Sequence, residues 1–328
     1  MYSIDKIKDV HLELTSKCQA RCPMCPRRIN GGPINPLISL SEISLDTFKE
    51  WFPERFLKQL NSLFMCGNLG DPIIAQDCLE ILQYIKGINP NIKLSMHTNG
   101  SARDIEWWQD LAKTGTRVVF GIDGIGEKHS VYRIGTDWHN IMRNAQVFIA
   151  AGGIAEWHML VFDHNQHQVN ESRNIASELG FAEFVTKHTS RFSKETFPVL
   201  DNEGKTLYQL RPTDKSKKNT QLLAAAKLEE RPNIFCKAKK YSQIYVGADG
   251  TVSPCCWLDF KWQLPNNENR IDYMDAVGYF PNLSESNLYD IFQSDFFKII
   301  ENTWAVKPLK ECSRQCGSFD KLGAQFED

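Results

Sequence analysis

A regular alternation of strand-like and helix-like stretches over the first 190 residues is the feature that most constrains the fold. Strand-like apolar runs occur at residues 10–14, 62–67, 92–98, 117–123, 155–162 and 182–189. Helical spacing of apolar residues occurs between these runs, at residues 45–60, 77–88, 105–115, 138–153 and 168–180. This alternation predicts an α/β fold with a parallel sheet and right-handed crossovers. In such folds the turns that follow the strands hold the chemistry.

Composition excludes several classes of protein. The 328 residues are 42% hydrophobic and 24% charged, which is typical of a packed globular chain with one large domain and an appendage, or with two domains. The 38 basic and 40 acidic side chains give a net charge of -2, so nothing indicates a nucleic-acid partner. Residues 1–14 lack the pattern of a signal peptide, and no apolar run approaches the ~20 residues that span a bilayer. We therefore expect a cytoplasmic protein without a membrane partner.

Three of the ten cysteines lie close together in "CQARCPMC", directly after the first expected strand: Cys18, Cys22 and Cys25. Cysteines of a cytoplasmic protein point to metal or redox chemistry rather than to disulfides. Three thiolates can hold three corners of a cubane iron–sulfur cluster and leave one iron with an open position. The alternative is zinc, with Cys66 or a histidine as fourth ligand. The spacing alone leaves both readings open.

A second group of cysteines lies near the C-terminus: Cys236, Cys255, Cys312 and Cys316. Four widely spaced thiols that converge can complete the coordination of an iron–sulfur cluster. A structural zinc site with the same ligands is the alternative. Cys256 is a spare that either replaces Cys255 as a ligand or packs beside Trp257.

The chain between the two groups changes character. Residues 195–235 are polar and rich in turn residues, which predicts a linker or surface insertion. Residues 242–257 alternate around Asp249-Gly250, a strong hairpin signal. A long irregular stretch and a helical pattern at 287–303 follow.

The cysteine triplet C-x3-C-x2-C after the first strand resembles the signature of the radical S-adenosylmethionine (SAM) enzymes. Met24 matches the apolar position that this family has before its last cysteine. The resemblance covers roughly residues 8 to 190 and implies a partial (β/α)6 TIM-like barrel at residues 1–194. It also implies that the three cysteines are the catalytic ligands of a [4Fe–4S] cluster whose open iron binds SAM.

Three further segments support the resemblance at the expected strand ends. "GNLGDP" (67–72) is similar to the family's GGEP segment, which holds the SAM amino group, with aspartate in place of the usual glutamate and leucine in place of the first glycine. "HTNG" (97–100) is similar to the segment that holds the SAM ribose or carboxylate. "FGIDG" (120–124) with "HSVYR" (129–133) is similar to S-x-D-G…H-x-x-x-R, with glycine where a SAM-contacting serine often stands. The resemblance implies SAM-binding roles for Met24, Gly70, Asp71, Thr98, Asn99, Gly121, Asp123, Arg133 and Asn165. An arginine there can pair with the SAM carboxylate, because a guanidinium matches a carboxylate fork.

The C-terminal cysteines resemble the SPASM/twitch extension of many radical SAM enzymes. A full SPASM domain begins its last group with C-x2-C-x5-C, and those cysteines are absent before Cys312. The resemblance therefore implies the reduced twitch form, a small α+β domain at residues 236–328. In this form Cys236, Cys255, Cys312 and Cys316 hold one auxiliary [4Fe–4S] cluster.

The resemblance implies a radical SAM oxidoreductase that abstracts hydrogen from an unactivated carbon of a small molecule or peptide. A flavodoxin- or ferredoxin-type protein is the expected reductant, and the auxiliary cluster is expected to assist oxidation. The first strand begins near residue 10, so we do not expect a separate N-terminal domain for a leader peptide. The alternative function is a non-catalytic zinc protein, such as an RNA- or protein-binding module.

A few other polar residues carry weaker signals. His97, His158 and His188 lie on expected strands. Each is interpreted either as a core histidine whose hydrogen bonds are made within the protein or as a catalytic residue, and the core role is at least as strongly indicated. Asp163 and Asp259 are candidate acids or bases on the substrate side, and by default they are expected to be solvated turn residues.

Overall fold

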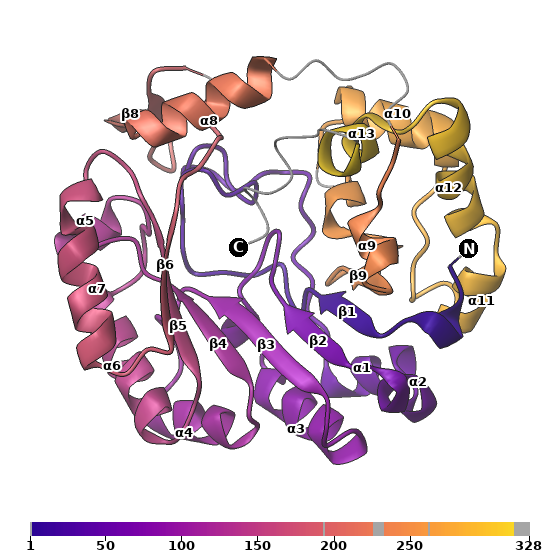
Figure 1. Cartoon of the computed structure of the whole chain (residues 1–328), viewed down its shortest axis with the longest axis horizontal. Coiled ribbons are helices and arrows are strands. Elements are labelled where there is room, and N and C mark those ends of the chain that lie inside the picture. Colours follow the sequence, from indigo (N-terminus) through magenta and orange to yellow (C-terminus); the bar gives the residue numbers. More distant parts are fainter. Residues whose placement is uncertain (1, 193, 226–232, 262, 318–328) are drawn as a thin grey trace.

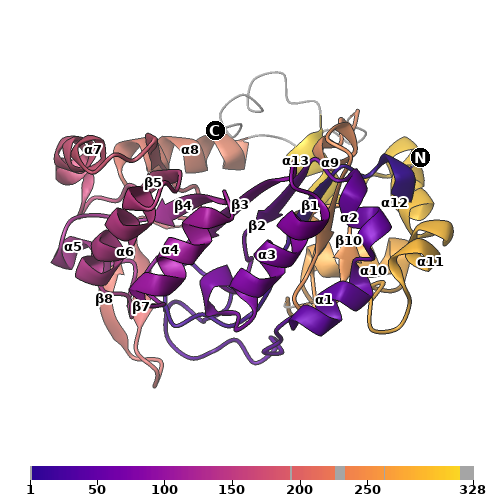
Figure 2. The same cartoon turned by 90° about the horizontal axis from the view of Figure 1, so that it is seen from below.

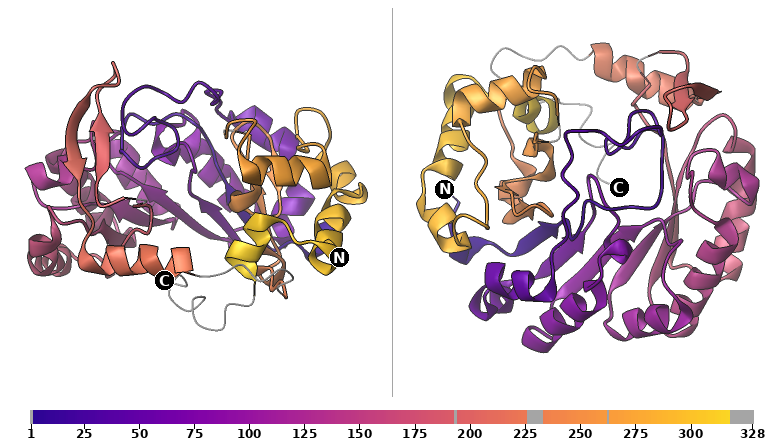
Figure 3. Two further views of the ribbon diagram at one scale, coloured as in Figure 1. Left: turned by 90° about the horizontal axis from the view of Figure 1, so that it is seen from above. Right: turned by 180° about the vertical axis from the view of Figure 1, so that it is seen from behind.

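The computed structural model describes residues 2–192, 194–225, 233–261 and 263–317. Within these ranges an eight-stranded sheet has the order β10-β9-β1-β2-β3-β4-β5-β6, and it curves around a concave side (Figures 1 and 3). Its N-terminal strands are parallel: β1 (Asp9–Leu12), β2 (Ser62–Met65), β3 (Lys93–Thr98), β4 (Arg117–Gly121), β5 (Ala155–Leu160) and β6 (Glu183–Lys187). The predicted α/β fold with a partial, TIM-like barrel of parallel strands is confirmed.

Helices cover the convex face of this sheet (Figures 1 and 2). They are α1 (Leu45–Trp51), α2 (Glu54–Gln59), α3 (Cys78–Ile88), α4 (Ile105–Lys113), α5 (Glu127–Ser130), α6 (Trp138–Ala150) and α7 (Val169–Glu178). The single helix expected at 45–60 is divided, because Pro53 lacks the N–H that would continue α1 and instead begins α2. The strand residues that face these helices, such as Met65 and Met96, are fully buried in the main core.

The concave face of the sheet carries polar and aromatic side chains that are only partly covered. A row of rings crosses it, with centroids 5.1 Å apart from His11 to Phe64, 5.1 Å from Phe64 to His97 and 5.6 Å from His97 to His158. Burial lowers the pKa of His97 to about 3, so this ring is neutral. His97 and His158 thus lie on the inner, half-covered side of the barrel rather than in the main core.

The C-terminal hairpin extends the barrel sheet. β9 (Gln243–Val246) pairs in parallel with β1, and β10 (Val252–Ser253) pairs antiparallel with β9. The predicted hairpin around Asp249-Gly250 is confirmed, and Gly250 adopts a positive φ of 85° that favours glycine. The backbone therefore joins the C-terminal part of the chain directly to the first barrel strand.

Short helices follow and precede this hairpin: α9 (Lys237–Lys240), α10 (Glu268–Val277), α11 (Leu288–Gln293), α12 (Phe296–Val306) and α13 (Lys310–Cys316). The stretch expected to be irregular after residue 257 contains α10. The Asn267 side chain caps its N-terminus by accepting from the backbone N–H groups of Asn269 and Arg270, and Gly278 ends it at a φ of 82°. Apolar periodicity did not reveal this helix, because it buries only Tyr273 and Val277.

The surface insertion expected at 195–235 has regular structure in its described residues. β7 (Phe197–Leu200) and β8 (Thr206–Leu210) form an antiparallel hairpin, and α8 (Asp214–Ala225) follows. The hairpin buries Val199 and Leu210 in a small core with Met24, beside the cysteine loop. Single-turn 3-10 helices lie at Ile4–Lys6, Pro72–Ile74, Gln166–Gln168 and Cys256–Leu258. No helix in the described ranges has the length and apolar character needed to cross a membrane.

Candidate functional site

The N-terminal cysteines lie on the loop that follows β1, on the concave side of the sheet (Figure 1). Two of their sulfurs face hydrogen-bond donors. The Cys18 sulfur lies 3.4 Å from the Ala20 N–H and 3.6 Å from Asn99 Nδ2. The Cys22 sulfur lies 3.9 Å from Arg133 Nη1. Donors and a cation favour thiolates, the form in which cysteine binds iron.

Burial opposes this tendency. It raises the pKa of Cys18 well above its usual range and that of Cys22 to about 11, although Arg133 acts in the opposite direction on Cys22. Metal binding displaces the protons of such thiols, so iron would relieve the cost of burying them.

The glycine-rich loop after β2 passes very close to the backbone of the cysteine loop. A Cβ atom at Gly70 would lie 1.7 Å from the carbonyl oxygen of Thr15, so only glycine fits there. The N–H groups of Leu69 and Gly70 donate to Glu13 Oε1 at 2.6 and 2.9 Å. Sequence reasoning missed Glu13, although its charge inside the apolar run "VHLEL" was a visible signal.

Asp71 braces the next loop. Its carboxylate accepts hydrogen bonds from Thr98 Oγ1 at 2.8 Å, from the Asn99 N–H at 2.7 Å and from Asn99 Nδ2 at 2.6 Å. Gln19 Nε2 donates to Asn99 Oδ1 at 2.8 Å. The structure thus brings the predicted residues Asp71, Thr98 and Asn99 together with Cys18, and the side chain of Asp71 is used to hold this arrangement.

A buried ion pair lies at the end of β4. Arg133 Nε donates to Asp123 Oδ2 at 2.6 Å, and the Leu160 N–H donates to Asp123 Oδ1 at 2.6 Å. A Cβ atom at Gly121 would lie 2.6 Å from Arg133 Nη2. The guanidinium therefore occupies the space where a serine side chain would stand, and the glycine at this position makes room for it.

Asn165 is fully buried and satisfied within the protein. Its Nδ2 donates to the carbonyl oxygens of Asp123 and Leu160 at 3.0 Å each, and its Oδ1 accepts from the Phe162 N–H at 2.7 Å. Both amide protons are used, so its role in the structure is to tie strand ends together. Met24 likewise packs into the small core beside the cysteine loop.

The four C-terminal cysteines predicted to converge line one cavity, together with Trp257 and Trp304: Cys236, Cys255, Cys312 and Cys316. A hydrogen bond with Cys316 and donors from α9 lower the pKa of Cys236 to about 6. Cys256 is not among the lining residues, and its carbonyl oxygen accepts from Asn68 Nδ2 at 3.2 Å.

In the described part of the chain, no three His, Cys, Asp or Glu side chains are arranged around one metal ion. A cubane places each cysteine on a separate iron atom, so the ligands of a cluster do not surround one metal ion.

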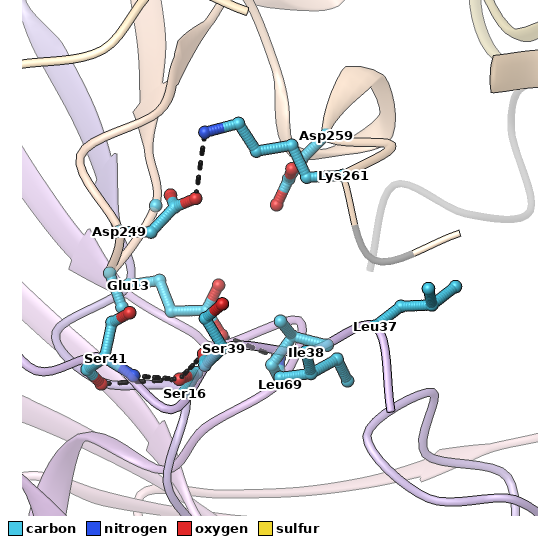
Figure 4. A pocket seen from close by; sticks show the side chains of 12 residues that line it. Glu13, Ser16, Leu37, Ile38, Ser39, Ser41, Leu69, Asp249, Asp259 and Lys261 are labelled. Atoms are coloured by element: carbon cyan, nitrogen blue, oxygen red, sulfur yellow. Dashed lines mark hydrogen bonds and ion pairs between the residues drawn. The ribbon is translucent and has the colours of Figure 1, made fainter. Parts of the chain in front are cut away.

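A further cavity of about 290 Å3 lies beside the glycine-rich loop (Figure 4). Glu13, Asp249, Asp259 and Lys261 line it, and Lys261 Nζ pairs with Asp249 at 3.1 Å. Tyr245 donates from its hydroxyl to Glu13 Oε2 at 2.7 Å and lies 3.2 Å from Asp259 Oδ2. Burial raises the pKa of Glu13 to about 7 and that of Asp259 to about 6. The expectation of a solvated Asp259 is wrong, because this residue follows the single-turn 3-10 helix Cys256–Leu258 and its side chain is buried against Tyr245.

Residues 12–173 match the radical SAM superfamily, and residues 236–317 match the SPASM iron–sulfur cluster-binding domain. The chain belongs to the radical SAM superfamily. More particularly, it is a radical SAM enzyme with a SPASM-type C-terminal part. Its cofactors are S-adenosylmethionine, the [4Fe–4S] cluster that binds it, and an auxiliary iron–sulfur cluster.

Solved structures share the fold. SuiB from Streptococcus suis bound to S-adenosylmethionine gives a TM-score of 0.56 at 15% identity, over 88% of this chain and 66% of the SuiB chain. Native anSMEcpe with bound AdoMet gives a TM-score of 0.58 at 17% identity, over 94% of this chain and 89% of that one. Our chain thus spans about two thirds of SuiB. No curated protein sequence matches it.

The residues present fit these cofactors. Thiol sulfurs that face N–H donors and an arginine suit a cluster of negative charge. The glycine at position 70 lets the glycine-rich loop approach the backbone of the cysteine loop, which keeps the two loops side by side.

Proposed function

We propose that this protein is a radical SAM oxidoreductase that acts on a small molecule or a peptide. When bound, the reduced cluster supplies one electron that cleaves S-adenosylmethionine, and the resulting 5′-deoxyadenosyl radical abstracts hydrogen from an unactivated carbon. The observation that supports this proposal is that the sulfurs of Cys18 and Cys22, two of the three closely spaced cysteines, face Asn99 and Arg133 from the following strand ends.

The protein's own residues have separate tasks. Cys18, Cys22 and Cys25 would hold the cluster, which would supply the site where SAM binds. Arg133 is held by Asp123 with Nη1 turned to Cys22, so its charge lies beside the cluster loop. There it favours both the thiolates and the carboxylate of SAM.

The C-terminal cysteines would hold one auxiliary cluster, which would supply an electron acceptor for net oxidation of the substrate. A flavodoxin- or ferredoxin-type protein would supply the electron that starts each cycle. A cytoplasmic setting, where thiols stay reduced, is part of the proposal. SuiB has been solved with the precursor peptide SuiA, and anSMEcpe with the Cp18Cys peptide, which supports peptides as one candidate substrate class.

Anaerobic reconstitution with iron and sulfide tests the proposal. We expect brown protein with about eight irons per chain, if both sites hold four-iron cubanes. With dithionite it should release methionine and 5′-deoxyadenosine in equal amounts. Cys22→Ala should abolish this release and lose about half of the iron. Cys78→Ala is the matched control, because Cys78 lies fully buried in α3 and belongs to neither group of cysteines.

The outcomes separate the alternatives. Colourless protein with stoichiometric zinc, and no cleavage of SAM, would refute the proposal in favour of a zinc-binding module. A radical enzyme whose C-terminal site holds zinc would keep its iron in Cys312→Ala and lose only zinc. Deuterium transfer between candidate substrates and deoxyadenosine would then identify the carbon that is attacked.

A further inference from the structure

A buried glutamate connects three parts of the chain. Glu13 follows β1 directly, and only 2% of its surface is exposed. One carboxylate oxygen accepts two hydrogen bonds from the glycine-rich loop, from Leu69 N at 2.6 Å and Gly70 N at 2.9 Å. The other accepts the hydroxyl of Tyr245, which lies on β9 of the C-terminal part, at 2.7 Å. Every polar atom of this side chain therefore has a partner, and each oxygen serves a different segment.

The glycine-rich loop is shaped around the first of these oxygens. A Cβ atom at Gly67 would lie 2.8 Å from Glu13 Oε1 and 2.2 Å from the Gly70 carbonyl oxygen. Both loop amides donate to a side chain that is itself buried, and N–H groups turned away from water need an acceptor. Without Glu13, the loop has no acceptor that would hold Leu69 and Gly70 in this conformation.

We propose that Glu13 is a positioning residue that fixes the glycine-rich loop in the conformation that binds SAM. This inference rests on the proposed function, in which that loop holds the amino group of SAM. Glu13 acts through the loop, because both of its oxygens are already paired within the protein. Its reach toward Leu69 and Gly70 matters more than its charge, because the loop needs an oxygen at that place.

Reach and charge can be separated with three variants of the reconstituted protein. Glu13→Gln keeps an oxygen at the same reach and loses the charge. Glu13→Asp keeps the charge and withdraws the oxygens by one methylene. Glu13→Met has a similar length and no acceptor. Tyr245→Phe removes the contact to the other oxygen and leaves both loop bonds in place.

Two measurements are needed: SAM affinity by isothermal titration calorimetry, and hydrogen exchange of residues 67–71 by mass spectrometry without SAM. We expect Glu13→Met and Glu13→Asp to weaken SAM binding at least about tenfold and to speed exchange of these amides by a similar factor. We expect Glu13→Gln and Tyr245→Phe to stay within about threefold of the wild type in both, since the Oε1 position keeps its two bonds.

The results decide between the alternatives. Wild-type affinity and exchange in Glu13→Asp and Glu13→Met would overturn the inference, as would Glu13→Gln weakening SAM as much as Glu13→Asp. If Glu13→Met does not fold, the comparison of SAM affinity and loop exchange between Glu13→Gln and Glu13→Asp still decides. A wild-type protein that does not bind SAM would refute the proposed function, whereas the exchange of the loop amides would still test the role of Glu13 in holding the loop.

Discussion

Replacing Gly70 with alanine tests the close approach of the glycine-rich loop to the cysteine loop. The added Cβ atom would lie 1.7 Å from the Thr15 carbonyl oxygen, where ordinary contact begins at 3.4 Å. The two segments must separate by roughly 1.7 Å, and neither can yield by a side-chain rotation, because the opposing atom is backbone. Overpacking of this kind costs about 1–3 kcal/mol. A misplacement of about 1 Å in a positioning element costs up to about 100-fold in rate.

We therefore expect Gly70→Ala to weaken SAM binding at least about tenfold, which corresponds to ~1.4 kcal/mol. Gly87→Ala is the matched control. Gly87 lies in α3, and no atom outside its own helix lies within 4 Å of the position of its Cβ. Alanine there should stabilise the fold by about 0.5–1 kcal/mol and leave SAM binding unchanged.

The assay is calorimetric titration with SAM of anaerobically reconstituted protein, alongside iron content and thermal unfolding. Iron content at the wild-type level shows that Gly70→Ala has folded with its clusters. If that variant then binds SAM as tightly as the wild type, the glycine-rich loop is not part of the SAM site, and the reasoning from its close approach fails.

Three further predictions concern buried charge. Arg133→Met leaves the fully buried Asp123 without its cation and should lower the free energy of unfolding by about 3 kcal/mol in a denaturant titration. Adding Asp123→Asn should restore most of this loss. A double variant as unstable as the single variant would contradict the pairing. Gly121→Ser places its Cβ against the Arg133 guanidinium and should weaken SAM binding several-fold with intact iron content, so unchanged affinity would argue against a role for that guanidinium. Burial raises the pKa of Glu13 from 4.5 to about 7 and that of Asp259 from 3.8 to about 6. The folded protein therefore holds these protons more tightly than the unfolded chain does. The free energy of unfolding that each group contributes is complete below about pH 4 and is lost as pH rises through 6 to 7, by up to about 3 kcal/mol each. The groups facing them are Tyr245, Cys66, Cys256, Asp249 and Lys261, and a combined Glu13→Gln and Asp259→Asn variant should flatten this part of the stability curve; an unaltered slope would refute the assignment.

The order of strands and the turns that carry the site were predictable because each depends on a local pattern. Short apolar runs and amphipathic stretches repeat at the expected lengths, and parallel strands bring their carboxyl ends to one edge. The segments around Gly70, Asn99 and Arg133 therefore had to meet near the cysteine loop. The domain boundaries at 194 and 235 remain a prediction.

The partners of individual side chains were not predictable in the same way. Asp71 could be placed at the site but not paired with Thr98 and Asn99, because hydrogen bonds between loops depend on how far each strand extends past its neighbour. Glu13 was overlooked for the same reason. Glu13 lies two residues after His11, so its side chain is expected on the same, concave side of the sheet. This orientation can be inferred only once the pairing register of β1 is known.

Adjacent cysteines show the same limit at the second site. The spacing could not decide between Cys255 and Cys256. In the structure Cys255 has extended backbone angles, with φ -152° and ψ 160°, so the two neighbouring side chains diverge. Cys255 lines the cavity of the four converging thiols, and Cys256 lies toward Cys66 and Asn68 instead.

The pairing of β9 with β1 determines how the two cysteine groups are related. Because β9 continues the sheet, backbone hydrogen bonds fix Tyr245 opposite His11, and Tyr245 reaches the carboxylate that holds the glycine-rich loop. Asn68 in that loop contacts the carbonyl oxygen of Cys256, one residue from a cysteine of the second group. The glycine-rich loop is thus attached on one side to Glu13, which follows β1, and on the other to the loop of Cys256, so a shift of the C-terminal part would also displace the glycine-rich loop.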